Sequence, residues 1–194
     1  MMMRKSNLIG TVALLTMLLL SGCGGSQDRT GADHTGTTTE VETTKLEDDN
    51  ISIGKRNALE SAKDFLTYDW SYNGLYDQLE YEGYTDEEIK YALDNCEADW
   101  KKNAVGMAKS YLGHSSFSYD GLRKQLIEYD KYTEDEAKYG VENCGADWNE
   151  EAKRMAEKWL ETDINFSSQG LYKQLIFAGF TEKQAEYGVT AVGY

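Results

Sequence analysis

The sequence predicts an all-α protein built as a tandem array of three small three-helix modules. Three observations carry this prediction. One pattern of segments recurs three times at intervals of 46 to 48 residues, proline is absent from all 194 residues, and signals for helix starts recur at corresponding places in each copy. Repetition at this period is typical of supersecondary units that follow one another in series, each contacting its neighbours.

Three aligned segments define each copy. The first segment reads NALESAKDFL (57–66), NAVGMAKSYL (103–112) and EAKRMAEKWL (151–160). The second reads WSYNGLYDQL (70–79), FSYDGLRKQL (117–126) and FSSQGLYKQL (166–175). The third reads YTDEEIKYAL (84–93), YTEDEAKYGV (132–141) and FTEKQAEYGV (180–189). We expect one short helix from each segment.

The third helix has the clearest pattern. Its apolar residues recur at i, i+3, i+4, i+7 and i+11, which places them on one helical face. In the first two copies they are Ile89, Ala92, Leu93, Cys96 and Trp100, then Ala137, Gly140, Val141, Cys144 and Trp148. A threonine followed three residues later by Glu or Gln predicts a capping box at each start, with Thr85, Thr133 and Thr181 as the N-caps.

The second helix has a serine as its expected N-cap: Ser71, Ser118 or Ser167. Gly83 and Gly179 are expected to end this helix in the left-handed conformation. The middle copy differs, with Lys131 and one extra residue in the turn.

Two similar segments link one copy to the next: KYALDNCEADW (90–100) and KYGVENCGADW (138–148). Gly145 permits a helix stop, and Asp147 is expected to cap the following helix. We predict that Trp100 and Trp148 are structural junction residues, because a unit of this size is close to the lower limit for an independent core. The alternative is an exposed aromatic residue that binds a partner. At the first junction Glu97 stands in the place of Gly145. A continuous helix across this junction is therefore an alternative.

The N-terminus predicts export. Arg4 and Lys5 precede an apolar run that suits a secretory signal, and the run ends in Leu20-Ser21-Gly22-Cys23, which resembles a lipobox. We expect a signal peptide over 1–22 and lipidation of Cys23; the alternative is a plain signal peptide and an incidental cysteine. A disordered acidic tether rich in Thr and Gly follows over 23–54. The expected repeats span 55–98, 99–146 and 147–194. The last one is truncated before the Asp-Trp pair that ends the linking segment in the other two.

Charge restricts the choice of partners. Outside residues 1–22 the chain has 34 acidic and 18 basic residues, a net charge of −16, which disfavours binding to nucleic acid and favours a basic partner. The net negative charge decreases along the modules, from −8 for 57–102 to −4 for 103–150 and −1 for 151–194. The alternative is that these charges serve only solubility. The acidic candidates for partner binding are Asp77, Glu80, Glu82, Asp86, Glu87, Glu128, Asp130, Glu134 and Asp135.

No residue pattern predicts catalysis, a cofactor or a metal site. The two histidines do not recur across the copies, and no metal-ligand spacing is present. We expect Cys96 and Cys144 to be buried packing residues, since a bridge needs Cα atoms within about 7 Å. Tyr91 and Tyr139, with Tyr187, lie off the apolar stripe; they either pack between helices or form half-exposed anchors for a partner.

The words FSYDGLRKQL, YTEDEAKYGVENCGADW and NAVGMAKSYL resemble the repeat of the Ltp-type host cell surface-exposed lipoproteins, over residues 57–194. The resemblance implies a helix-turn-helix arrangement in each module and a location on the outer face of the cell membrane. We expect the protein to be a monomer. The resemblance also implies superinfection exclusion, in which an acidic surface binds a basic segment of the incoming phage tape measure protein. Another function stays open: a structural envelope lipoprotein that binds the cell wall or a protein.

Overall fold

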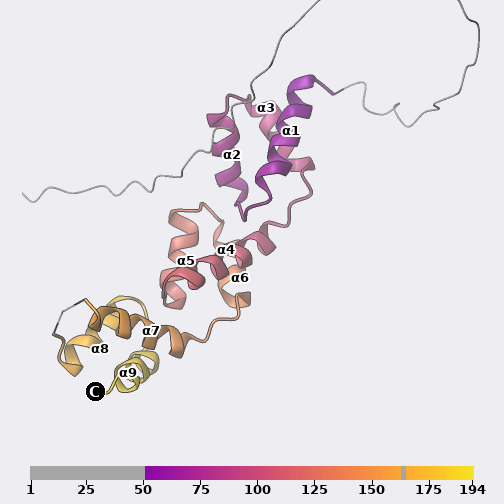
Figure 1. Ribbon diagram of the computed structural model, residues 1–194. Helices are drawn as coiled ribbons and strands as arrows, with labels where there is room; N and C mark the ends of the chain where they lie inside the picture. Colours follow the sequence, from indigo (N-terminus) through magenta and orange to yellow (C-terminus); the bar gives the residue numbers. More distant parts are fainter. Residues whose placement is uncertain (1–50, 163–164) are drawn as a thin grey trace, which may run out of the picture. The chain divides into compact units, whose positions relative to one another are not determined.

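The computed structural model describes residues 51–162 and 165–194, and over these residues it is all-α, with nine helices and no strand (Figure 1). This confirms the predicted fold class. The helices of module 1 are α1 (Ile53–Phe65), α2 (Tyr72–Tyr81) and α3 (Asp86–Asn95). Module 2 has α4 (Trp100–His114), α5 (Tyr119–Glu128) and α6 (Glu134–Asn143). Module 3 has α7 (Trp148–Leu160), α8 (Ser168–Phe177) and α9 (Glu182–Ala191).

Each module has its own hydrophobic core. The first helix contributes two alanines, the second contributes two leucines and the third contributes its apolar stripe. The fully buried members of module 1 show the pattern: Ala58, Ala62, Leu75, Leu79, Ile89 and Ala92. Modules 2 and 3 repeat it with their own residues. Because extensive helix-helix contacts occur within modules, each module buries its apolar face chiefly against itself.

Small residues bring the first and third helices of a module close together. A Cβ atom added to Gly140 on α6 would lie 2.7 Å from the carbonyl oxygen of Ala104 on α4. At Gly188 on α9 the added atom would lie 3.0 Å from the backbone of Ala152 on α7. These helix pairs therefore pack backbone against backbone at these points, with no room for a side chain.

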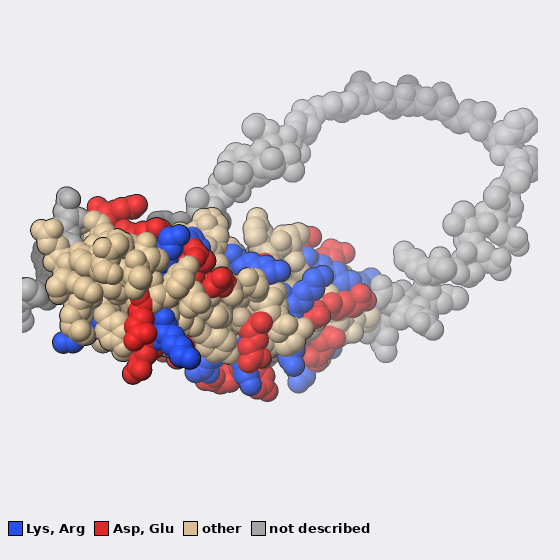
Figure 2. Space-filling model, turned by 90° about the horizontal axis from the view of Figure 1, so that it is seen from below, with Lys and Arg blue, Asp and Glu red and all other residues tan. Residues whose placement is uncertain are grey.

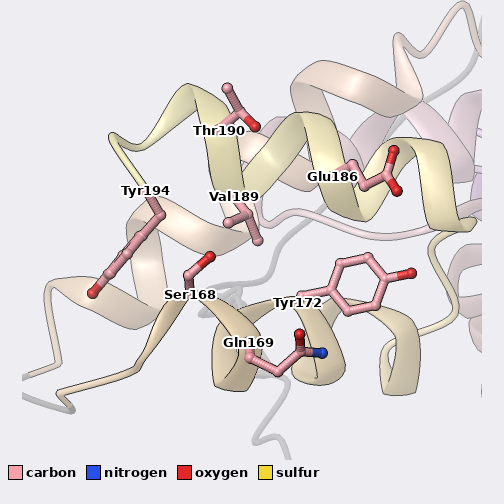
Figure 3. Close-up of a pocket in the computed structure, with 7 residues that line it drawn as sticks. All are labelled: Ser168, Gln169, Tyr172, Glu186, Val189, Thr190 and Tyr194. Atoms are coloured by element: carbon pink, nitrogen blue, oxygen red, sulfur yellow. The ribbon is translucent and has the colours of Figure 1, made fainter.

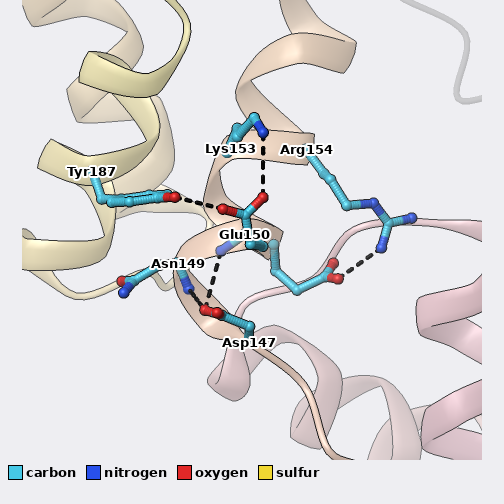
Figure 4. Close-up of polar contacts among 7 residues, drawn as sticks. Asp147, Asn149, Glu150, Lys153, Arg154 and Tyr187 are labelled. Atoms are coloured by element: carbon cyan, nitrogen blue, oxygen red, sulfur yellow. Dashed lines mark hydrogen bonds and ion pairs between the residues drawn. The ribbon is translucent and has the colours of Figure 1, made fainter.

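The predicted helix starts are confirmed. In each second helix the serine Oγ accepts a hydrogen bond from the backbone N–H three residues on, as in Ser71 with Gly74 at 2.9 Å. Each third helix has the predicted capping box, with Thr85, Thr133 and Thr181 as N-caps. Asp147 caps α7 by accepting from the backbone N–H groups of Asn149 and Glu150 (Figure 4). The start of α1 lies at Ile53, within the expected tether, because Ser52 provides the cap.

Left-handed residues end the second helices. Gly83 and Gly179 have φ of 92° and 90°, as predicted, and the middle module places Lys131 at φ 60° in the same turn. At the first junction the alternative of a continuous helix is wrong. Helix α3 ends at Asn95, Glu97 takes φ 58°, and α4 begins at Trp100. Glu97 thus adopts the conformation of Gly145, whose φ is 78°.

Replacing Glu97 with glycine should stabilise the protein. A non-glycine residue in the left-handed region costs roughly 1–2 kcal/mol, and glycine loses part of that gain to its greater freedom in the unfolded chain. We therefore expect Glu97→Gly to raise the free energy of unfolding by about 1 kcal/mol, measured by urea denaturation. Gly145→Glu should produce the opposite change. A destabilised Glu97→Gly protein would contradict this account of the turn.

The predicted signal peptide, Cys23 and the tether up to residue 50 lie outside the described residues. In the part of the chain that the structure does describe, no helix has the length and apolar character needed to cross a membrane.

Candidate partner-binding site

Four of the nine predicted acidic residues already have basic partners inside the protein, and a fifth is partly buried. Four form ion pairs: Asp77 with Lys131, Glu87 with Lys55, Glu128 with Lys124, and Glu134 with Arg123. The fifth, Asp130, is partly buried and accepts a hydrogen bond from the Tyr111 hydroxyl at 3.1 Å. Ion pairs on a surface contribute little stability, but each one reduces the negative charge available to an approaching partner.

The other four acids, Glu80, Glu82, Asp86 and Asp135, are exposed and have no basic partner among the described residues. Three of them gather where α2 turns into α3. Tyr81 lies between two of these acids in the chain, and 84% of it is exposed. We call the residues Glu80, Tyr81, Glu82 and Asp86 the acidic corner.

The helix geometry strengthens the negative potential at the acidic corner. Glu80 and Glu82 lie at the C-terminal end of α2, whose last turn has no basic residue. The C-terminal end of a helix carries partial negative charge, so these carboxylates add to it instead of compensating it. A cation bound here would relieve that repulsion. Asp86 opens α3, where the helix dipole favours it, and accepts a hydrogen bond from the Tyr76 hydroxyl at 3.1 Å.

Each module exposes an aromatic ring at this turn. Tyr81, Tyr129 and Phe177 recur at intervals of 48 residues and are 84%, 71% and 89% exposed. The three rings differ in their neighbours. Acids flank Tyr81 and Tyr129, whereas Phe177 follows the exposed Ile176. Our sequence reasoning missed these rings because it followed the apolar stripes; their 48-residue spacing, off those stripes, was the available signal.

The predicted aromatic anchors are engaged within their own modules. The ammonium group of Lys55 lies 5.7 Å from the centre of the Tyr91 ring, and that of Lys101 lies 5.5 Å from the Tyr139 ring. Both are within the range of cation–π interactions. In module 3 the Tyr187 hydroxyl donates to Glu150 instead (Figure 4). These tyrosines therefore lie half-exposed between the first and third helices, which makes them less available to a partner than Tyr81.

Charged side chains of both signs are scattered among uncharged residues on the face that Figure 2 shows. Acidic and basic residues are interspersed there, and no continuous acidic strip runs along that face. The negative charge that a partner meets therefore depends on local clusters and on the net charge of each module. The acidic corner is such a cluster, and it belongs to the module with the largest negative charge.

Trp100 and Trp148 each begin the first helix of a module and pack on the core of the preceding one. The Trp100 ring lies 5.6 Å from that of Tyr72, and the Trp148 ring lies 5.6 Å from that of Tyr119, both edge to face. Trp100 contacts the module 1 cluster, and Trp148 contacts the module 2 cluster. Their energetic contribution to the junctions stays a prediction.

Hydrogen bonds between modules surround Asp130. The Ser71 hydroxyl donates to the Asp130 carbonyl, and the Tyr132 hydroxyl donates to the Asp69 carbonyl at 2.7 Å. One carboxylate oxygen of Asp130 is buried without a partner. Burial raises the pKa of Asp130, and the hydrogen bond from Tyr111 opposes this only in part.

This raised pKa predicts a pH-dependent loss of stability. The folded protein holds the Asp130 proton more tightly than the unfolded chain does, so the contribution is present at low pH and is lost as pH rises through the folded pKa. We expect Asp130→Asn to be more stable than the parent at pH 7, with the difference shrinking toward pH 4. Urea denaturation at both pH values measures it, with Asp135→Asn as the control for charge removal. A difference independent of pH would contradict this role for Asp130.

The two cysteines of the described residues are buried and unbridged. Each thiol lies near the carbonyl oxygen three residues earlier, at 3.3 Å for Cys96 and 3.2 Å for Cys144. Burial raises the pKa of Cys96, which disfavours a reactive thiolate. Within the ranges that the structure describes, no group of His, Cys, Asp and Glu side chains is arranged to hold a metal ion.

These features define a class: a tandem array of three-helix modules that exposes charged and aromatic side chains. A family model described as host cell surface-exposed lipoprotein matches residues 54–96, 99–144 and 147–192. The chain therefore belongs to this lipoprotein family, which confirms the resemblance in the sequence.

A solved structure similar to this chain is that of Ltp, a superinfection exclusion protein from the Streptococcus thermophilus temperate phage TP-J34. The two sequences are 35% identical, with a TM-score of 0.45. The match covers 48% of this chain and 97% of that one. No curated protein matches the chain.

Proposed function

We propose that this protein is a membrane-anchored surface lipoprotein that blocks the injection of phage DNA by binding a basic segment of the phage tape measure protein. Membership of the surface lipoprotein family supports its location. The observation that carries the binding proposal is the acidic corner. Its three carboxylates have no ion-pair partners among the described residues, and two of them flank the exposed Tyr81 in the chain.

The acidic corner suits a lysine- or arginine-rich polypeptide. Glu80, Glu82 and Asp86 supply the charge, and Tyr81 supplies a ring on which a cation can rest. Charge of this kind speeds association and rejects anions, so it selects a basic protein over nucleic acid. The mechanism is binding, and it requires no chemical step.

Anchoring places the binding surface at the membrane. Lipidation of Cys23 would attach the chain to the bilayer, and two or more acyl chains suffice for stable anchoring. Module 1 is the nearest module to Cys23 in the sequence and has the largest negative charge. The protein would therefore present its acidic corner close to the point where DNA enters the cell.

Neutralising the acidic corner tests the proposal. The variant Glu80→Gln, Glu82→Gln, Asp86→Asn should bind a basic tape measure segment about tenfold more weakly, since each exposed ion pair contributes roughly 0.2–1 kcal/mol. The control Glu157→Gln, Glu161→Gln, Glu182→Gln removes three exposed charges from module 3 and should change the affinity less than about twofold. Binding should weaken between 0.05 and about 1 M salt as screening shortens.

The same variants separate adsorption from DNA entry in a susceptible host. The parent protein should leave phage adsorption normal and block DNA entry, and the acidic-corner variant should restore entry. If the acidic-corner variant and the module 3 control exclude the phage equally well, the electrostatic proposal is wrong. Exclusion that survives Cys23→Ala undiminished would remove anchoring from the mechanism.

The repeated exposed rings favour a second candidate function, binding to a polymer of the cell wall. Tyr81, Tyr129 and Phe177 recur in all three modules, including module 3, where no acid flanks the ring. If the protein is a structural envelope lipoprotein, Phe177→Ala should weaken binding to isolated cell walls while the acidic-corner variant does not. Its expression should then have no specific effect on phage DNA entry.

A further inference from the structure

Module 3 has an open groove between α8 and α9 with a volume of about 330 Å³ (Figure 3). Ser168 and Tyr172 line it from α8, and Glu186 and Val189 line it from α9. Tyr194 closes one end, where its hydroxyl donates to the Phe166 carbonyl at 2.7 Å. No other side chain of the described residues fills this space.

The other two modules show what fits in this place. Ser168 is the first residue of the second helix, and its counterparts in modules 1 and 2 are Tyr72 and Tyr119. Those two rings hold Trp100 and Trp148 edge to face, at centroid distances of 5.6 Å. Each of these tryptophans comes from the start of the following helix and packs on the core of the module before it. In modules 1 and 2 the surface that corresponds to the groove therefore binds the indole ring of a tryptophan.

The module 3 groove keeps the elements that an indole needs. Val189 corresponds to the core residues Leu93 and Val141 and gives the groove an apolar side chain, while Gln169 and Thr190 add polar side chains to the lining. Tyr172 and Tyr194 add aromatic walls, while Ser168 leaves open the space that a tyrosine ring takes in the other modules. Aromatic rings in such a cradle gain both apolar burial and edge-to-face contacts.

One charge in the groove is reversed relative to the other modules. Glu186 occupies the position of Lys90 in module 1 and Lys138 in module 2. With glutamate in that place, the module 3 groove favours a cation beside the indole.

We propose that the groove between α8 and α9 binds a tryptophan side chain of a second polypeptide that carries lysine or arginine next to that tryptophan. The occupant is defined by the two indoles seated in modules 1 and 2 and by the reversed charge at Glu186. This site lies in a different module from the acidic corner, and the inference does not depend on the function proposed for that corner.

A pair of short peptides tests the groove. One carries Ala-Lys-Trp-Lys and the other Ala-Asp-Trp-Glu, each with 5-fluorotryptophan, and each is titrated to millimolar concentration into the full mature chain with Cys23→Ser. We expect the basic peptide to bind more tightly by about two- to fivefold, as exposed charge pairs allow. Amide NMR shifts should change at Ser168, Glu186 and Val189 and stay constant in modules 1 and 2. The basic peptide with alanine in place of tryptophan should not bind.

Two surface substitutions, each to a residue found at the same place in modules 1 and 2, complete the test. Ser168→Tyr should strengthen binding of the basic peptide by about three- to tenfold, because it restores the edge-to-face contact. Glu186→Lys should reverse the preference in favour of the acidic peptide. Unchanged affinity in Ser168→Tyr, unchanged preference in Glu186→Lys, or no binding at millimolar peptide would overturn the proposal. So would concentration-dependent dimerisation that the basic peptide abolishes, since a second copy would then occupy the groove.

The triple variant of the acidic corner distinguishes tryptophan binding at the groove from tape measure binding at the acidic corner. It should bind the basic tryptophan peptide with the parent's affinity at the groove. Loss of tape measure binding in that variant, with peptide binding intact, would show two independent surfaces.

Discussion

Trp148→Ala should lower the free energy of unfolding by about 3 kcal/mol, which is at the lower end of the range for truncating a large aromatic residue. The Trp148 ring packs edge to face on Tyr119 and on the core of module 2, yet its backbone begins α7 of module 3. Its removal leaves a space over the module 2 core and loosens the first turn of α7. Both modules should therefore lose stability together.

Urea denaturation followed by far-UV circular dichroism measures this effect. Trp148→Phe keeps an aromatic ring and should cost less than half as much. Phe177→Ala, which removes a ring that is 89% exposed, should stay within about 0.5 kcal/mol of the parent. If Trp148→Ala also stays within that limit, the tryptophan does not stabilise the junction.

Gly140→Ala should destabilise the protein by about 1–2 kcal/mol, although alanine is the better helix former. The new Cβ would lie 2.7 Å from the Ala104 carbonyl oxygen and 2.8 Å from its carbonyl carbon. Both are backbone atoms of α4, so the two helices must move apart, and overpacking of this kind costs roughly 1–3 kcal/mol. The intrinsic helix preference of alanine over glycine, up to about 1 kcal/mol, offsets only part of that cost.

The matched control is Gly113→Ala in the same module. Gly113 also lies in a helix, α4, but a Cβ there would meet no atom within 4 Å. This substitution should stabilise the protein by about 0.5 kcal/mol through helix preference alone. Thermal and urea unfolding of both variants compare the two glycines. If both substitutions stabilise the protein, α4 and α6 do not approach as closely as the structure shows.

The sequence predicts the helices of this protein well because their signals are local. A capping box needs a threonine and an acid or amide three residues later, and a buried stripe needs only its spacing. Thr133, for example, and the stripe from Ala137 to Cys144 both lie where their patterns indicate. The first junction is harder to predict because Glu97 adopts a backbone conformation that favours glycine.

The candidate site depends on contacts that no local pattern contains. Asp77 pairs with Lys131 of the next module, and the Ser71 hydroxyl reaches the carbonyl of Asp130. Such contacts follow from how two modules meet. The sequence therefore lists nine acids without showing which four are exposed and have no basic partner among the described residues. The same holds for Tyr91, because spacing shows that it leaves the apolar stripe and does not show that Lys55 covers its ring.

The three cores share no residue, and each is assembled from a stretch of chain shorter than 50 residues. Folding rates fall as contacting residues lie farther apart in the chain, so this arrangement favours rapid folding whatever the number of modules. A polypeptide that passes through a secretion channel unfolded can complete its first core while the last is still inside. The array therefore needs no finished C-terminus before its N-terminal part becomes resistant to proteases.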